Sequence, residues 1–111
     1  MSDRKCFVYV NHSRYKGRLI TKVGRSFCPE KRIGQFNNGL KHRYRNKYLD
    51  ERVSFRQFFC MAPLSVSECK ALELTFLRNN RSRTLHQFGL EVFSFSPEAA
   101  ALELCRLAGQ Q

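Results

Sequence analysis

The sequence lacks any hydrophobic run that approaches the roughly 18–20 residues of a membrane-spanning helix. Its first five residues lead into a half-polar segment and not into the apolar region of a signal peptide. It also contains no internal repeat and no linker-like stretch. These absences predict one soluble, cytoplasmic domain spanning residues 1–111, without a membrane partner.

Closely spaced cysteine pairs are absent as well. The five cysteines are scattered along the chain, and none forms the Cys-x-x-Cys pattern that is common in structural zinc sites. An odd number of cysteines without an export signal is typical of reduced thiols in the cytosol. We therefore expect no structural zinc, and we expect Cys60 and Cys69 to pack as small hydrophobic side chains.

Acidic residues are few. Nine Asp and Glu against twenty Lys and Arg leave a formal charge of +11. Residues 1–56 hold 15 basic and 4 acidic side chains, whereas residues 57–111 hold five of each. A small protein with so uneven a positive charge favours a polyanionic partner, with nucleic acid ahead of a membrane surface. A role of this charge in solubility alone is the other explanation left open.

What the chain does have is material for a core. Hydrophobic residues make up 42% of it, with ten Phe and four Tyr, which argues against disorder. The patterns of apolar and turn residues predict an α+β fold, in which helices pack on a small mixed sheet of three to four strands in the order β-β-α-β-α-β-α. The predicted strands span residues 6–10, 18–24, 53–61 and 89–95, with 11–17 as the first connection, and the predicted helices span 28–36, 65–80 and 96–109.

One segment combines cations with aromatic rings. Residues 41–48 interleave Lys and Arg with two tyrosines. Such a segment can hold phosphates by charge and stack bases on its rings. A solvated loop whose tyrosines cover the core is an equally good explanation.

A single carboxylate stands out in the predicted helix 65–80. Glu73 borders the apolar face of that helix, where a charge is costly unless it is paired or bound to a metal. A structural ion pair with Arg32 would satisfy it. A single divalent cation, completed by water and a phosphate oxygen, would satisfy it too.

The residues in their order resemble a GIY-YIG nuclease domain, of the branch named after a phage T5 open reading frame. The resemblance covers nearly the whole chain, and its most specific part is the segment 22–39. The stretches that carry it are Phe7-Val8-Tyr9, Lys22-Val23-Gly24-Arg25-Ser26, Pro29-Glu30-Lys31-Arg32, Glu73, Leu90-Glu91-Val92-Phe93 and Ser96-Pro97-Glu98-Ala99. It implies a metal-dependent endonuclease that hydrolyses DNA phosphodiester bonds with low sequence specificity, in a bacterial or phage-infected cell.

The resemblance also implies roles for individual residues. Tyr9 matches a tyrosine that helps to deprotonate the attacking water. Lys22 stands at the tyrosine of the second motif as a cation for phosphate, and Gly24 allows close backbone approach. Arg32 stabilises the phosphate in the transition state. Glu73 holds one Mg²⁺ or Mn²⁺.

A wider set of residues is expected to bind nucleic acid. Asn80 is included because some members carry an amide downstream of the glutamate. The set consists of Arg25, Lys41, Arg43, Tyr44, Arg45, Lys47, Arg78, Asn80, Arg81 and Arg83.

Two positions depart from the motifs. Phe7 replaces the glycine of the first motif, and Phe36 stands where nucleases of this kind carry a polar histidine or tyrosine. Because Phe36 neither accepts nor donates a proton, a binding module of the same fold without cleavage is the first alternative. A basic domain that binds an acidic protein is the second.

Overall fold

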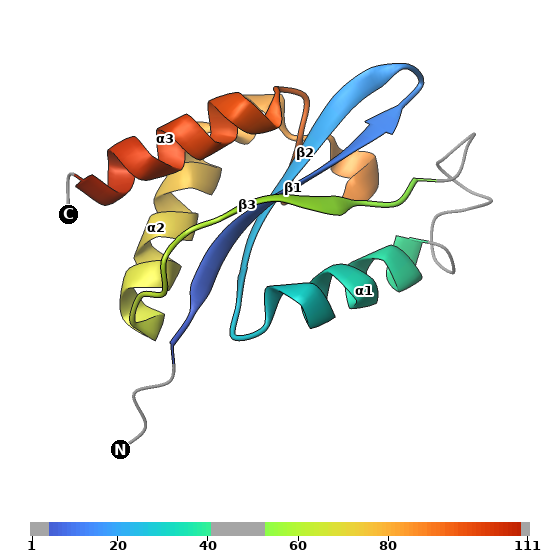
Figure 1. Ribbon diagram of the computed structural model, residues 1–111. Coiled ribbons are helices and arrows are strands. Elements are labelled where there is room, and N and C mark those ends of the chain that lie inside the picture. The colour runs from blue at the N-terminus through green and yellow to red at the C-terminus, as the bar shows by residue number, and fades with distance from the viewer. Residues whose placement is uncertain (1–4, 41–52, 110–111) are drawn as a thin grey trace.

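The computed structural model describes residues 5–40 and 53–109 (Figure 1). The predicted α+β class and the order β-β-α-β-α-β-α are confirmed. The elements are β1 (Phe7–Tyr15), β2 (Arg18–Ser26), α1 (Pro29–Gly39), β3 (Arg56–Cys60), α2 (Val66–Asn79), the short 3₁₀ helices η2 (Arg81–Arg83) and η3 (His86–Phe88), β4 (Val92–Phe93) and α3 (Pro97–Gly109).

The four strands form one sheet in the order β3-β1-β2-β4. All three pairings are antiparallel, so the described sheet is not mixed. β1 and β2 pair without interruption from Phe7↔Ser26 to Tyr15↔Arg18. Lys16 and Gly17 close this hairpin with φ angles of 52° and 78°, the two positive values that a tight I′ turn requires.

The first hairpin is longer than the sequence predicts. The prediction that residues 11–17 connect the two strands was wrong for most of that range, because residues up to Tyr15 continue the ladder with β2. The polar side chains of Asn11, His12 and Ser13 suggested a loop. Their backbone groups instead find partners in the neighbouring strand, which outweighs a weak local preference.

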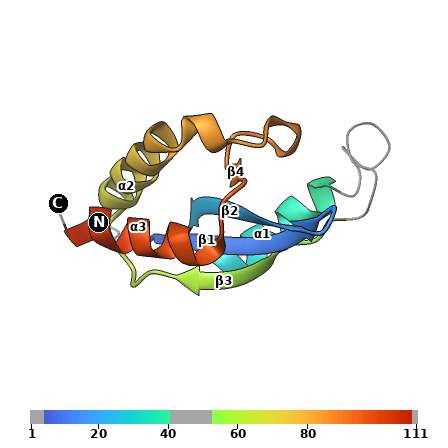
Figure 2. The ribbon, with the colours of Figure 1, turned by 90° about the horizontal axis from the view of Figure 1, so that it is seen from above.

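The two outer strands are shorter than predicted. β3 covers Arg56–Cys60 of the predicted 53–61, and its pairing with β1 shifts register between Val10 and Asn11. β4 covers Val92–Phe93 of the predicted 89–95, and it pairs with β2 at Thr21 and Lys22. Beyond this point, residues 24–26 of β2 have no described strand on that side (Figure 2). This open edge positions the candidate site.

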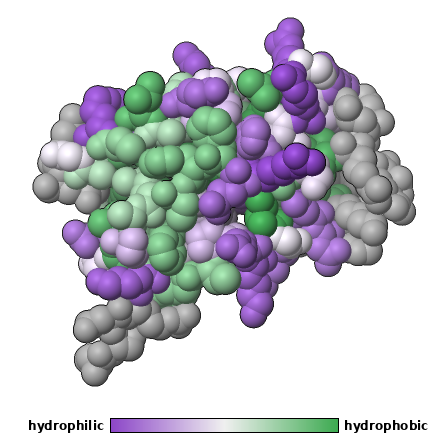
Figure 3. Space-filling view, in the orientation of Figure 1, coloured by the Kyte–Doolittle hydropathy of each residue, from purple (hydrophilic) through white to green (hydrophobic). Residues whose placement is uncertain are grey.

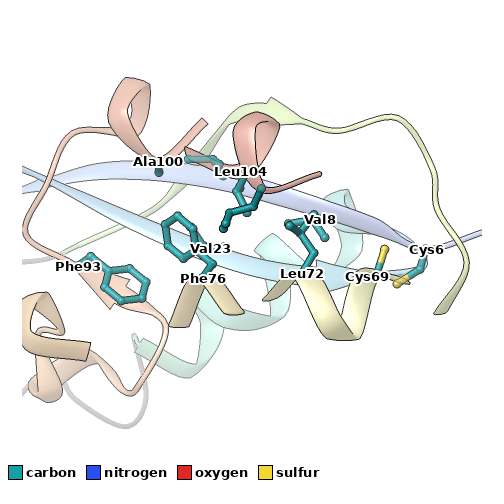
Figure 4. Packing of buried hydrophobic residues seen from close by; sticks show 11 residues of the cluster. Cys6, Val8, Val23, Cys69, Leu72, Phe76, Phe93, Ala100 and Leu104 are labelled. Atoms are coloured by element: carbon teal, nitrogen blue, oxygen red, sulfur yellow. The ribbon is translucent and has the colours of Figure 1, made fainter. Parts of the chain in front are cut away.

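Alternation along the strands sends side chains to two separate cores. The first core lies under α2 and α3 (Figure 4). It contains Cys6, Val8, Val10, Val23, Cys69, Leu72, Phe76, Phe93, Ala100, Leu104 and Leu107. Cys69 is fully buried, as predicted, and burial raises the pKa of its thiol to about 12.

The second core lies by α1, on the other side of the hairpin in Figure 1. It contains Ile20, Leu40, Val53, Phe55, Phe88 and Val92, with Ile33 and Phe36 of α1 packed against it. Tyr9, Lys22 and Gly24 alternate with the valines of the first core, so they point to the α1 side.

Local signals at the helix ends are confirmed. The Ser65 hydroxyl accepts a hydrogen bond from the Glu68 N–H at 3.2 Å, and the Glu68 carboxylate accepts one from the Ser65 N–H at 3.1 Å. This is the predicted capping box of α2. The Ser96 hydroxyl likewise accepts a hydrogen bond from the Ala99 N–H at the start of α3.

The surface is uneven in character. Figure 3 shows hydrophobic side chains gathered over the α3 side and hydrophilic ones over the hairpin and the α1 side. Within the described ranges, no helix combines the length and the apolar character needed to cross a membrane.

Candidate active site

The candidate site lies at the open edge of β2. Glu91 lies at this edge and interacts with groups on both faces of the sheet. Glu91 precedes β4, and its carbonyl accepts a hydrogen bond from the Val23 N–H at 3.0 Å. Its carboxylate Oε1 lies 2.5 Å from Nζ of Lys22, on the α1 side. The same carboxylate acts on Glu73 of α2, where it raises the pKa of that group.

Tyr9 lies across β2 at this edge. Its side chain is fully buried, and a Cβ built on Gly24 would lie 2.6 Å from the phenol oxygen. Only glycine therefore leaves room for the ring at position 24, which agrees with the close approach expected there. The phenol finds no hydrogen-bond partner among the described residues.

The charge state of Tyr9 follows from its surroundings. Burial raises the pKa of the phenol well above its ordinary value, and the Glu91 carboxylate adds to this. The Arg32 guanidinium opposes the rise, and the Glu73 carboxylate reinforces it. Tyr9 is therefore a neutral hydroxyl at pH 7, buried and able to form one hydrogen bond with a group that enters the site.

Lys22 is enclosed within the protein. Its side chain is 1% exposed, its ammonium pairs with Glu91, and that ammonium lies 4.5 Å from the ring centroid of Phe36. A buried ammonium of this kind is stabilised by its carboxylate and by the ring face. Since Lys22 already has an internal partner, contact between Lys22 and a phosphate stays a prediction.

The ring at position 36 has a structural role here. Phe36 packs edge-on against Phe55, with ring centroids 5.5 Å apart. The Lys22 ammonium lies over the Phe36 ring. A side chain without an aromatic ring at this position would lose both contacts. Phe36 and Lys22 are thus in contact in the structure.

Glu73 is held by Arg25 and not by Arg32. Nε of Arg25 lies 3.0 Å from Oε1 of Glu73, whose side chain is 9% exposed. The ion pair with Arg32, one of the two explanations that the sequence left open, does not form because Arg32 lies on α1, whereas Arg25 shares the face of Val23 and points toward α2. Burial raises the pKa of Glu73 to about 7, Glu91 adds to the rise, and Arg25 opposes it.

The donor set fits one hard divalent cation. The Glu91 carboxylate lies close enough to Glu73 to raise the pKa of Glu73, and a cation beside Glu73 would oppose this rise. In the structure Glu73 is paired with Arg25 and Glu91 with Lys22. Within residues 5–40 and 53–109, no group of three or more His, Cys, Asp or Glu side chains converges.

Arg32 reaches the same place from the α1 side. It is exposed, and it lines an open pocket of about 460 Å³ together with Gln35, Phe36, Leu90 and Glu91. Its charge acts on the Tyr9 phenol, so the two groups are close. The structure thus gathers the predicted Tyr9, Lys22, Gly24, Arg32 and Glu73 at one edge of the sheet, and adds Glu91.

Sequence reasoning did not give Glu91 a role. The signal available was an acidic residue directly before a short buried strand, where a charge needs a partner. The partner, Lys22, lies 69 residues away in the sequence. A local sequence pattern does not predict a pair between residues so far apart in the chain.

Other predicted binding residues lie elsewhere. Asn80 is seven residues beyond Glu73, about 10 Å along α2, and its amide donates to the Phe76 carbonyl and the Glu103 carboxylate. Arg83 lines a small pocket beside Asn80. The structure therefore does not bring Asn80 to the open edge of β2.

Two arginines of the predicted set lie nearer. Arg78 and Arg81 line a separate hollow that also includes Leu90, and Leu90 borders the Arg32 pocket as well. The remaining members of the set lie outside the described residues: Lys41, Arg43, Tyr44, Arg45 and Lys47.

Comparison of the chain with protein-family models, curated proteins and solved structures finds no match.

Proposed function

We propose that this chain is a metal-dependent endonuclease that hydrolyses DNA phosphodiester bonds with low sequence specificity. The observation that carries the proposal is that the Arg32 guanidinium and the Glu73 carboxylate both lie near enough to the Tyr9 phenol to act on its pKa. The Tyr9 hydroxyl is buried and has no hydrogen-bond partner among residues 5–40 and 53–109, the Glu73 carboxylate is buried, and the Arg32 guanidinium is exposed. The resemblance in motif order assigns the same three residues.

Each residue has a chemical task in this proposal. Arg32 binds the scissile phosphate by charge-assisted hydrogen bonds, which strengthen as negative charge develops. The neutral hydroxyl of Tyr9 orients the attacking water by a hydrogen bond. Glu73, with Glu91 beside it, holds one Mg²⁺ or Mn²⁺, and a bound cation supplies charge neutralisation and acidifies water. Arg25 keeps Glu73 in place when no cation is bound.

The basic half of the chain supports a polyanionic substrate. The excess of 15 basic over 4 acidic residues in 1–56 attracts phosphate backbones over long distances. The proposal places the activity in the cytoplasm of a bacterial or phage-infected cell, on the strength of the resemblance alone.

A binding module without cleavage is the second candidate. The ring of Phe36 occupies the position of a proton-transferring residue, and Lys22 is already paired with Glu91. With these two features the site keeps its shape but has fewer groups that can donate or accept a proton than an active nuclease of this kind would need. A basic domain for an acidic protein partner is supported by net charge alone.

The test is nicking of supercoiled plasmid with Mg²⁺ or Mn²⁺. We expect Glu73→Gln and Arg32→Ala each to reduce the nicking rate at least about a hundredfold, in line with the loss of a transition-state charge. Glu98→Gln and Arg106→Ala on α3 serve as matched controls, because both residues are exposed and remote from the edge of β2.

The outcomes separate the candidates. Nicking that survives both site variants would refute the assignment. Absence of nicking by the wild-type protein, together with salt-sensitive DNA binding, would establish the binding module instead.

A further inference from the structure

A second hollow lies beside the Arg32 pocket, on the α2 side. It measures about 330 Å³, and its lining combines leucines with arginines. The residues that line it are Leu74, Leu77, Arg78, Arg81, Thr84, His86 and Leu90. Among the described residues, no acidic side chain belongs to this lining, although α2 itself carries Glu68 and Glu73.

Leu90 is shared by the two hollows. It lines this one and the Arg32 pocket, and its side chain is 72% exposed. Gly89, with φ of 108°, precedes it and allows the sharp change of direction that sets Leu90 outward. The proposed cleavage site and the second hollow are therefore adjacent, with a protruding aliphatic side chain between them.

We propose that the second hollow binds one unpaired nucleotide next to the scissile phosphate, so that the substrate is forked or single-stranded DNA. This inference rests on the proposed function, since the strand is taken to continue from Arg32 past Leu90. It names a substrate class that the motifs by themselves do not specify.

The chemistry of the lining matches such an occupant. Arg78 and Arg81 complement the phosphate charge, and no carboxylate in the lining opposes them. The leucines and His86 of the lining suit a flat base, because bases pack on apolar side chains and stack on imidazole and guanidinium planes.

Leu90 adds a reason why the nucleotide is unpaired. A base inside a duplex is stacked on both faces and cannot enter a side hollow without leaving the helix. An exposed apolar side chain beside the strand can act as a wedge that separates neighbouring bases. At a fork this separation already exists, so binding there avoids the cost of unstacking.

The experiment compares DNA forms of one sequence. Fluorescein-labelled single strand, blunt duplex and forked duplex are titrated with the full chain in Ca²⁺, and fluorescence anisotropy gives each affinity. We expect the fork to bind roughly tenfold more tightly than the duplex, the scale of one stacked base. We expect Leu90→Ser and Arg81→Ala to bring that ratio close to one.

Matched controls test whether the effects of Leu90→Ser and Arg81→Ala are specific to the second hollow. Leu102→Ser removes a leucine of similar exposure, 74%, from α3, and Arg106→Ala removes an exposed arginine from the same helix. Both should leave the fork-to-duplex ratio unchanged. A 2-aminopurine placed at the unpaired position should lose fluorescence on binding to the wild-type protein and not to Leu90→Ser.

Three outcomes would overturn the inference. The first is a wild-type ratio near one while Glu73-dependent nicking persists, which would leave the proposed function intact. The second is a Leu90→Ser ratio equal to that of the wild type. The third is competition by polyglutamate as effective as that by the fork, which would identify an acidic peptide as the occupant. If no form of DNA binds, the proposed function fails as well.

Discussion

Gly24 and Tyr9 occupy one space on neighbouring strands: a Cβ on Gly24 would lie 2.6 Å from the phenol oxygen and 2.8 Å from the ring carbon that bears it. The two residues are direct partners in the β1–β2 ladder. The Tyr9 ring is fully buried and has no open space into which it can move easily. The glycine is thus required by packing as well as by the proposed chemistry.

The first prediction concerns this contact. Gly24→Ala should lower the free energy of unfolding by about 1–3 kcal/mol, the usual cost of overpacking a core. Gly34→Ala in α1 is the control, because no atom lies within 4 Å of its added Cβ. It should raise stability by up to about 1 kcal/mol, as Ala is the better helix former. Urea unfolding measures both; equal effects would contradict the packing argument.

The second prediction separates chemistry from structure at Tyr9. The phenol is buried without a described hydrogen-bond partner, so its hydroxyl contributes a desolvation cost and no bond to the fold. Tyr9→Phe should therefore be as stable as the wild type, or more stable by about 1 kcal/mol. Its plasmid nicking should nevertheless fall by about a hundredfold. A parallel loss of stability and activity would indicate a merely structural tyrosine.

The third prediction concerns the pair formed by the buried Lys22 and the partly exposed Glu91. Glu91→Gln leaves a buried ammonium without its carboxylate and should cost about 3 kcal/mol. Lys22→Met should rescue much of this loss in the double variant, because no unpaired charge then remains inside. A double-mutant cycle with thermal unfolding measures the coupling. Additive effects of the two substitutions would show that the pair contributes nothing specific.

The fourth prediction is a pH dependence from Glu73. Its pKa is raised from 4.5 to about 7 in the folded protein, so the folded state binds the proton more tightly than the unfolded chain. Without divalent cations, this group should make the free energy of unfolding decrease as the pH rises from about 4.5 to about 7. At pH 8, Glu73→Gln should then be more stable than the wild type, by at most about 3 kcal/mol.

Addition of a divalent cation should work against the stability advantage of Glu73→Gln over the wild type. Mg²⁺ at pH 8 should raise the melting temperature of the wild type, since binding to the folded state stabilises it. Glu73→Gln should show little change. Differential scanning calorimetry at several pH values measures both effects, and a wild-type profile identical to that of the variant would refute this account of Glu73.

The sequence by itself determined the class and order of the elements. Helix starts were readable because Ser65 with Glu68, and Ser96 with Ala99, form hydrogen bonds within one turn. The β-branched and aromatic residues of 6–10 likewise marked the first part of β1. These signals are local, so they can be recognised in the sequence without knowledge of the rest of the fold.

Only the tertiary structure decided strand lengths and partners. The hairpin extends to Tyr15 because β2 pairs with polar residues that favour a loop in isolation. Arg25, and not Arg32, meets Glu73 because the parity of positions along β2 sets which face each side chain takes.

The electrostatics of the site were likewise decided by packing. Glu91 meets Lys22 across 69 residues and acts on Glu73 across the edge of the sheet. A side chain's burial, and hence the pKa of its acid or phenol, depends on distant segments that remove water from around it. Sequence pattern records which residues are available, whereas desolvation and pairing arise when the fold brings them together.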